Sequence, residues 1–186
     1  MVGAAVAYAR VFKGQERTEG FWTVFGLILL TVVLLQVLSN WANDLGDHEN
    51  GADGSERTDR MVASGQLSPA AMKRAIVALG VVAFGCGLAS VAAAFWGTSL
   101  LVEALVMVGL GVLAIGAAYR YTAGTNPYGY RGLGDLMVLV FFGWIGVGGS
   151  AFLMAGEWDS TWLLPGTWTG LMSTAVLNLN NMRDHL

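Results

Sequence analysis

The sequence predicts an all-α, polytopic transmembrane helical bundle, and three observations point to this class. Hydrophobic residues make up 55% of the 186 residues and charged residues only 12%, whereas soluble domains carry roughly 25% charged residues. The mean hydropathy is +0.57. The charges are also clustered, and the uncharged runs between them reach the ~20 residues that a helix needs to cross a hydrocarbon core of about 30 Å.

Six helical segments follow from these runs, taken in chain order. There is no charge between residues 21 and 41, only Glu103 between residues 75 and 119, and none between residues 136 and 156. The first run is too short to span a membrane and is interpreted as the second half of a helix. We expect helices at about residues 1–12, 21–43, 71–96, 99–119, 136–155 and 164–182, in one membrane domain that covers residues 1–186.

The connections between these helices alternate in length. The link near residue 98 and the link at residues 157–162 are short, whereas residues 44–70 and 120–135 form long segments rich in charge, glycine and asparagine. A long polar loop among short ones is a common place for a functional site.

The basic residues predict the orientation of the bundle in an inner (cytoplasmic) membrane. Three of them fall on the side of the short links, and the others fall on the side of the long loops: Arg57, Arg60, Lys73, Arg74, Arg120, Arg131 and Arg183. The positive-inside rule therefore places the long loops in the cytoplasm. An interfacial belt at the opposite ends of the helices is expected from Trp22, Trp96, Trp158, Trp162 and Trp168.

The second predicted helix runs into a polar sequence. If the helix continues, Asn40, Asn43, Asp44 and Asp47 lie at positions i, i+3, i+4 and i+7, on one face; Asp53 follows six residues later. Polar side chains in a membrane helix are costly and indicate a functional site. Two carboxylates one turn apart repel each other unless a cation lies between them.

The last predicted helix ends in a similar pattern. Asn180 and Asp184 repeat the four-residue spacing of Asn40 and Asp44, on the same side of the membrane. Mg²⁺ is usually held by one or two carboxylates together with water and substrate phosphate oxygens, so two such elements could hold Mg²⁺ around one diphosphate. The alternative is an Asn/Asp-rich stretch that only caps helix ends in water.

The third polar segment, residues 119–135, carries tyrosine and arginine. By itself it is typical of a Gly/Pro turn with interfacial tyrosines. Beside a diphosphate site, Arg131 and Arg183 are candidate partners of the phosphates, because a guanidinium group matches phosphate oxygens in bidentate fashion. Tyr119 and Tyr121 could flank a cationic or aromatic reactant.

Three segments together resemble the UbiA superfamily of intramembrane prenyltransferases. They are LSNWANDLGD at residues 38–47 followed by GAD at 51–53, NPYGYRGLGD at 126–135 leading into FFG at 141–143, and AVLNLNNMRD at 175–184. The first and third look like the two aspartate-rich motifs of the family. The middle one is similar to the branch that acts on 1,4-dihydroxy-2-naphthoate rather than 4-hydroxybenzoate.

The resemblance implies a Mg²⁺-dependent transfer of a polyprenyl chain from an allylic polyprenyl diphosphate to 1,4-dihydroxy-2-naphthoate. The ring loses its carboxylate as CO₂, which gives demethylmenaquinone for menaquinone biosynthesis. Asp44, Asp47 and Asp184 are the implied catalytic carboxylates and metal ligands, with Asp53 as a further metal ligand. The implied substrate-binding residues are Asn40, Asn43, Arg60, Tyr119, Tyr121, Arg131, Asn180 and Arg183.

Two departures from the family pattern lead us to expect a fragment, incomplete at both ends. The family has a complete first helix, and its second aspartate motif continues to a further aspartate beyond Asp184. We therefore expect the 186-residue chain to be inactive when it is expressed alone.

Other functions stay open at this point. A 4-hydroxybenzoate polyprenyltransferase would share the aspartate motifs. A CDP-alcohol phosphotransferase carries Ala-Arg after its first aspartate pair, whereas Asp47 is followed here by His48. A cation-coupled transporter would place its carboxylates nearer the middle of the membrane. The net charge of −3 argues against a nucleic-acid partner.

Overall fold

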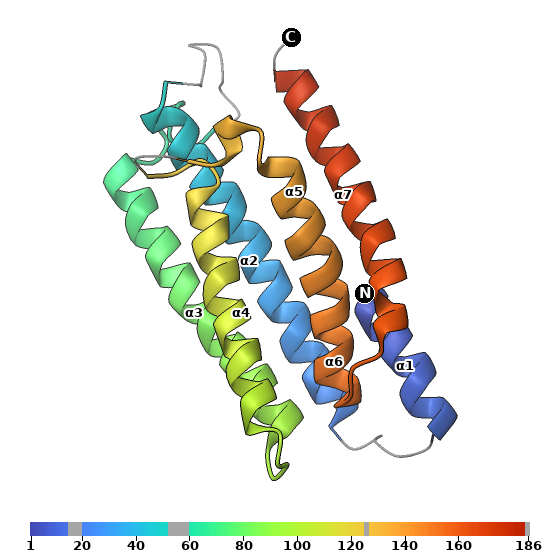
Figure 1. Cartoon of the computed structure of the whole chain (residues 1–186). Helices are drawn as coiled ribbons and strands as arrows, with labels where there is room; N and C mark the ends of the chain where they lie inside the picture. Colours follow the sequence, from blue (N-terminus) through green and yellow to red (C-terminus); the bar gives the residue numbers. More distant parts are fainter. Residues whose placement is uncertain (15–19, 52–59, 125–126, 185–186) are drawn as a thin grey trace.

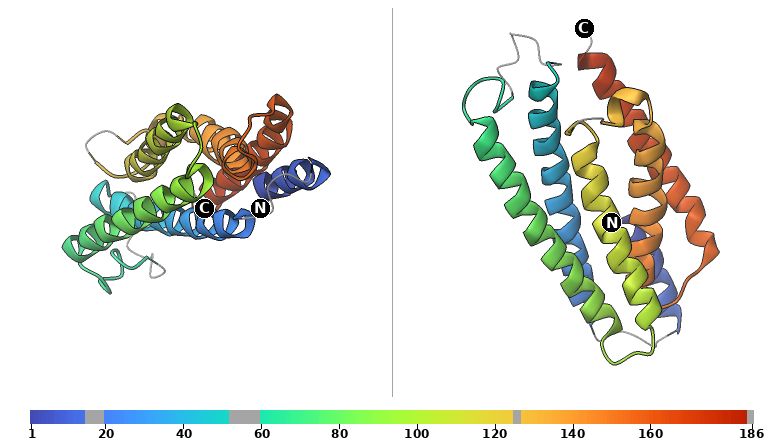
Figure 2. Two further views of the ribbon diagram at one scale, coloured as in Figure 1. Left: turned by 90° about the horizontal axis from the view of Figure 1, so that it is seen from below. Right: turned by 60° about the vertical axis from the view of Figure 1, so that its left-hand side comes forward.

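The computed structural model describes residues 1–14, 20–51, 60–124 and 127–184, and all the regular structure in these ranges is helical. The long helices run side by side in a bundle, and the two views in Figure 2 show the same arrangement as Figure 1. The elements are α1 (Val2–Gly14), α2 (Phe21–Glu49), α3 (Pro69–Phe95), α4 (Leu101–Arg120), η1 (Gly129–Arg131), α5 (Gly134–Val138), η2 (Leu139–Gly149), α6 (Ser150–Ala155), η3 (Ser160–Trp162) and α7 (Leu163–Asp184).

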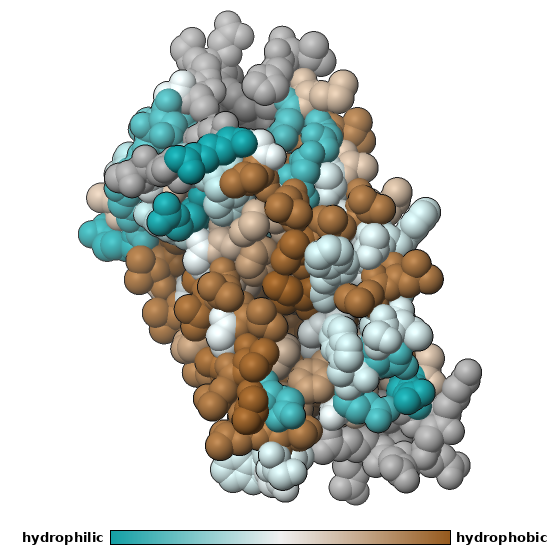
Figure 3. Space-filling view, viewed as in Figure 1, coloured by the Kyte–Doolittle hydropathy of each residue, from teal (hydrophilic) through white to brown (hydrophobic). Residues whose placement is uncertain are grey.

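Among the described residues, four helices are long and apolar enough to cross a membrane. They are α2, α3, α4 and the continuous helix Gly134–Ala155, which α5, η2 and α6 form together. On the face shown in Figure 3, apolar residues cover the middle of the molecule and polar residues gather toward the upper end. Large apolar side chains such as Val102 and Leu113 point outward from α4, as lipid contact requires. The chain is a polytopic helical membrane bundle, as predicted.

Helix α2 continues beyond the predicted end at residue 43 and reaches Glu49. Packing explains the extension, because Ala42 and Leu45 are buried in an apolar cluster with Met72 and Ile76 of α3. The condition for a shared polar face is therefore met: the residues from Asn40 to Asp47 all lie within one helix.

Helix α7 packs closely against η2, which is a π-helix, and glycines permit the close contact. A Cβ atom added to Gly143 would lie 2.6 Å from the carbonyl oxygen of Gly166, and one added to Gly170 would lie 2.8 Å from the carbonyl oxygen of Leu139. Small residues let membrane helices approach each other in this way. We call Gly143, Gly166 and Gly170 the glycine seam.

At the end of the bundle away from the aspartates, Arg10 on α1 contacts the link before η3. Its Nε atom lies 2.9 Å from Oε1 of Glu157. The rings of Trp158 and Trp162 pack edge to face with centroids 6.0 Å apart. Trp162 departs from the predicted interfacial belt, because it is only 4% exposed and belongs to the apolar core with Ala7. The other predicted belt residues Trp22, Trp96, Trp158 and Trp168 are exposed.

Candidate functional site

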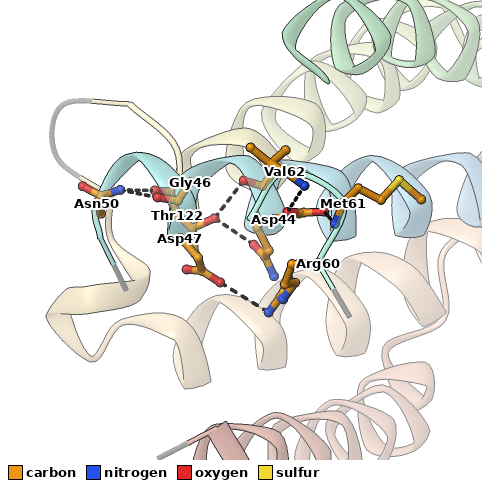
Figure 4. A network of polar contacts seen from close by, with 10 residues as sticks. Asp44, Gly46, Asp47, Asn50, Arg60, Met61, Val62 and Thr122 are labelled. Atoms are coloured by element: carbon orange, nitrogen blue, oxygen red, sulfur yellow. Dashed lines mark hydrogen bonds and ion pairs between the residues drawn. The ribbon is translucent and has the colours of Figure 1, made fainter. Parts of the chain in front are cut away.

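Asp44 is buried at the upper end of α2, and its side chain binds the segment that leads to α3. Its side chain is 6% exposed. Oδ2 accepts the backbone N–H of Met61 at 2.9 Å, and Oδ1 accepts that of Val62 at 3.3 Å (Figure 4). Val62 in turn is buried in the apolar cluster with Leu45. The carboxylate thus joins the end of α2 to the segment that leads to α3 by satisfying two of its backbone N–H groups.

Asp47, three residues later, lies beside Arg60. Nη2 of Arg60 donates to Oδ2 of Asp47 at 3.4 Å. The Asp47 side chain is 18% exposed and the Arg60 side chain is 21% exposed. Figure 4 shows Asp47 on the same stretch of α2 as Asp44, with Arg60 beside it. A carboxylate and a guanidinium group that are both partly open to solvent can also reach an anion or a cation that enters the site.

The segment after α4 is joined to the same end of α2 through Thr122, which is 4% exposed. The single hydrogen of the Thr122 hydroxyl is shared between two acceptors, the carbonyl oxygen of Ala42 at 3.1 Å and Oδ1 of Asn43 at 3.0 Å. In the other direction, the amide group of Asn50 donates to the carbonyl oxygens of Gly46 at 2.7 Å and of Thr122 at 3.0 Å. Figure 4 shows these contacts along the last turns of α2.

Glycine at position 46 is required by this contact. A Cβ atom there would lie 2.5 Å from both the carbonyl carbon and the carbonyl oxygen of Thr122, closer than any unstrained contact. The glycine of the first polar motif therefore permits the backbone of the residue 121–124 segment to touch α2.

Tyr121 and Tyr128 belong to the same segment. Their rings pack edge to face with centroids 5.5 Å apart, and the hydroxyl of Tyr128 donates to the carbonyl oxygen of Ala117 at 2.7 Å. Burial raises the pKa of the Tyr128 phenol to about 12. Burial also raises the pKa of Tyr121, and the nearby carboxylates of Asp47 and Asp135 add to the shift. Both phenols are therefore protonated donors at neutral pH.

Asp135 connects the segment to α7. The amide group of Asn178 donates to Oδ2 of Asp135 at 3.3 Å, and the Thr174 hydroxyl donates to the Asp135 carbonyl oxygen at 3.3 Å. The residue 121–135 segment is thus bonded to α2 at one end and to α7 at the other. It links the two helices that carry the aspartate-rich motifs.

The remaining predicted residues lie around this network. Asn40 and Asn180 are exposed on their helices, Tyr119 is exposed at the end of α4, and Arg131 is exposed at the end of η1. Asp53 falls outside the described residues. The backbone of Arg183 and Asp184 forms the last turn of α7, at the same end of the bundle as the upper end of α2 (Figure 1), and their side chains are outside the described part.

Sequence reasoning missed three residues of the network: Thr122, Asn50 and Asp135. Asp135 carried a usable signal, because it closes a polar segment directly before a long apolar run. Thr122 and Asn50 carried none, because a threonine or asparagine in a polar loop is an ordinary surface residue.

The oxygen donors at this end of α2 fit a magnesium site. Mg²⁺ needs only one or two carboxylates when phosphate and water oxygens supply the other ligands, and Asp44 and Asp47 lie one turn apart. In the described part of the chain, no group of three His, Cys, Asp or Glu side chains is placed to hold a metal ion. The backbone amides of Met61 and Val62 already use one lone pair on each oxygen of Asp44, which is buried. The side chain of Asp47 reaches solvent and is the more accessible carboxylate of the two.

Comparison with known proteins places this architecture in a family. The sequence profile of the UbiA prenyltransferase family matches residues 1–185, and the chain belongs to this family. The match favours the predicted prenyltransferase class over the phosphotransferase and transporter alternatives.

Two relatives with the same enzyme name show how far the similarity extends. The chain is 42% identical over 189 aligned residues to the 1,4-dihydroxy-2-naphthoate octaprenyltransferase of Haemophilus influenzae, covering 96% of this chain and 60% of that protein. It is 46% identical over 160 residues to the enzyme of the same name from Escherichia coli, covering 85% of this chain and 51% of that protein. The chain thus spans half to three-fifths of the length of these relatives. No solved structure gives a significant match.

Proposed function

We propose that the protein transfers a polyprenyl chain from an allylic polyprenyl diphosphate to 1,4-dihydroxy-2-naphthoate, with loss of the ring carboxylate as CO₂. The observation that carries the proposal is the carboxylate face of α2, bonded through the residue 121–135 segment to α7, in a chain 46% identical to a naphthoate octaprenyltransferase. The product is the demethylmenaquinone skeleton of menaquinone biosynthesis.

In this proposal Asp44, Asp47 and Asp184 hold Mg²⁺, with Asp53 as a further ligand. When bound, Mg²⁺ supplies positive charge that stabilises the departing diphosphate. Asp44 has a second task, because it also anchors the backbone at Met61. Asp47 can turn from Arg60 toward a cation, since the side chains of Asp47 and Arg60 both reach solvent.

In this proposal the substrate is bound by residues of α2, α4, η1, α7 and the segments that follow α2 and α4. Arg60 and Arg131 match diphosphate oxygens, and the proposal adds Arg183, Asn40 and Asn180 as polar partners. Tyr119 and Tyr121 flank the reacting carbons. The aromatic face of Tyr121 can stabilise a developing allylic cation.

The apolar surroundings suit this chemistry. Helices open to lipid can accept a long isoprenoid tail, and a site of low water content protects an allylic cation from hydrolysis. We place the protein in the cytoplasmic membrane as a multi-pass enzyme, with the aspartates facing the cytoplasm.

The test uses the full-length protein in membranes, supplied with labelled polyprenyl diphosphate, Mg²⁺ and 1,4-dihydroxy-2-naphthoate. We expect Mg²⁺-dependent formation of a prenylated, decarboxylated product, and a loss of at least about 100-fold in Asp47→Asn. Glu103→Gln, which changes a carboxylate on α4, is the matched control and should retain activity.

Two results would count against parts of the proposal. Full turnover in EDTA would remove the metal assignment. Equal kcat/KM values for 4-hydroxybenzoate and 1,4-dihydroxy-2-naphthoate would remove the acceptor assignment while leaving prenyl transfer in place.

A further inference from the structure

Thr122 is a buried polar residue outside the aspartate motifs, and its hydroxyl is bonded to one of them. We propose that Thr122 is a positioning residue that holds the carboxamide of Asn43 in place on α2, beside the aspartates that are proposed to bind Mg²⁺ and the diphosphate. The inference rests on the function proposed above and gives a buried residue outside the aspartate motifs a part in it.

The contact ties a side chain to its own helix through one atom. The Thr122 hydroxyl lies 3.0 Å from Oδ1 of Asn43 and 3.1 Å from the carbonyl oxygen of Ala42. A hydroxyl group has a single hydrogen to donate, so these two acceptors share it. The carboxamide of Asn43 is therefore held to the same buried hydroxyl as the backbone of α2.

The Thr122 hydroxyl is itself held in place from several directions. It bonds the carbonyl oxygen of Ala42 at 3.1 Å, so it is tied to the backbone of the helix that carries Asn43. The Thr122 carbonyl accepts the Asn50 amide at 3.0 Å, and the Thr122 backbone packs where Gly46 lacks a side chain. A β-branched side chain also has few rotamers to choose from. The contact with Asn43 is therefore rigid.

The experiment compares variants of the full-length protein in membranes. Thr122→Val keeps the shape and removes the hydroxyl, whereas Thr122→Ser keeps the hydroxyl. We expect Thr122→Val to lower kcat/KM for polyprenyl diphosphate about tenfold, as for the loss of one buried hydrogen bond, with an unchanged KM for the aromatic acceptor. Thr122→Ser should restore kcat/KM to within about twofold of wild type.

Thr31→Val is the matched control, because the Thr31 hydroxyl bonds a carbonyl oxygen of its own helix, that of Leu27. It should behave as wild type. If Thr122→Val did no more than Thr31→Val, or if Thr122→Ser failed to restore activity, the proposed positioning role would be wrong.

A double-mutant cycle separates positioning from general stability. In an Asn43→Ala background, Thr122→Val should lower kcat/KM by a further factor of less than about two, because the group that Thr122 positions is already gone. If the loss of kcat/KM in the double variant equalled the product of the losses in the two single variants, the inference would be wrong and Thr122 would act on the fold.

A spectroscopic measurement keeps the test independent of turnover. In protein labelled with ¹⁵N-asparagine, the Asn43 side-chain amide signal, assigned by its loss in Asn43→Ala, should shift in Thr122→Val and stay in place in Thr31→Val. No shift would overturn the inference. A shift in a protein that transfers no prenyl group would support the contact with Asn43 and reject the proposed function.

Discussion

At the scale of single residues, the two aspartates of the first motif have different surroundings, although they lie three residues apart on one helix. Asp44 is buried, and both of its oxygens accept backbone N–H groups. Asp47 is half-buried and is paired with a side chain, Arg60. A buried carboxylate that satisfies backbone donors contributes more to stability than a solvent-accessible ion pair.

This contrast predicts that Asp44→Asn destabilises the protein more than Asp47→Asn. The asparagine amide group would meet the N–H groups of Met61 or Val62 with a donor instead of an acceptor, at a cost of about 1–3 kcal/mol. Loss of the pair with Arg60 should cost at most about 1 kcal/mol. Thermal unfolding of the purified variants in detergent checks the order, and equal Tm values would contradict it.

A second prediction at this scale concerns Gly46. Alanine is the better helix former by about 1 kcal/mol, but its Cβ atom would lie 2.5 Å from the backbone of Thr122. We expect Gly46→Ala to destabilise the protein by about 1–3 kcal/mol, as overpacking does, and to lower prenyl transfer.

Gly116→Ala provides the control, because a Cβ atom at this position of α4 meets nothing within 4 Å. It should leave the Tm unchanged or raise it slightly. A Gly46→Ala variant as stable as Gly116→Ala would show that the segment containing Thr122 does not press against α2.

At the scale of elements, α7 is held by two kinds of contact. The glycine seam brings its backbone against η2, and Asn178 bonds Asp135 at the upper end. In the membrane interior, an apolar helix gains little from leaving lipid, so close packing and a few polar bonds hold helices together. The position of the second aspartate-rich motif therefore depends on backbone contact along η2.

The third prediction tests the glycine seam. In Gly143→Ala the new Cβ atom would lie 2.6 Å from the Gly166 carbonyl oxygen, and α7 must move away. We expect a loss of about 1–3 kcal/mol of stability together with lower activity, measured by thermal unfolding and by the prenyl-transfer assay. Gly111→Ala on α4, where a Cβ atom meets nothing within 4 Å, should leave both unchanged.

At the scale of the whole molecule, polar contacts occupy the two ends of the bundle and apolar surface lies between them. The aspartates and their partners lie at one end, whereas Arg10 and Glu157 meet at the other. The basic residues are concentrated at the aspartate end. This asymmetry supports a single orientation in the membrane with the site in the cytoplasm.

The fourth prediction tests this orientation with single cysteines in a Cys86→Ala background of the full-length protein. Ser64 and Ser160 are both exposed, near opposite ends of the bundle. On intact cells, or on spheroplasts where an outer membrane is present, a membrane-impermeant thiol reagent should label Ser160→Cys but not Ser64→Cys. Both should react after the cells are lysed. Labelling of position 64 alone in intact cells would reverse the topology.

The sequence by itself determined the class and the order of the elements. Apolar runs long enough to span a bilayer allow few structures other than helices, because backbone groups in lipid must bond within the segment. The same periodicity placed Asn43, Asp44 and Asp47 near one another, since residues three and four apart share a helix face. These are local relations, and local relations can be predicted without a fold.

Only the tertiary structure decided how these residues are used. The bond from Thr122 to Asn43 joins residues 79 positions apart, and that from Asn178 to Asp135 joins residues 43 positions apart. No periodicity encodes such pairs, because they arise from the way α2, α4, α5 and α7 pack. The same packing leaves no room for a side chain at Gly46 and gives Asp44 its backbone partners. Such close contacts depend on the distance between whole elements rather than on neighbours in the chain.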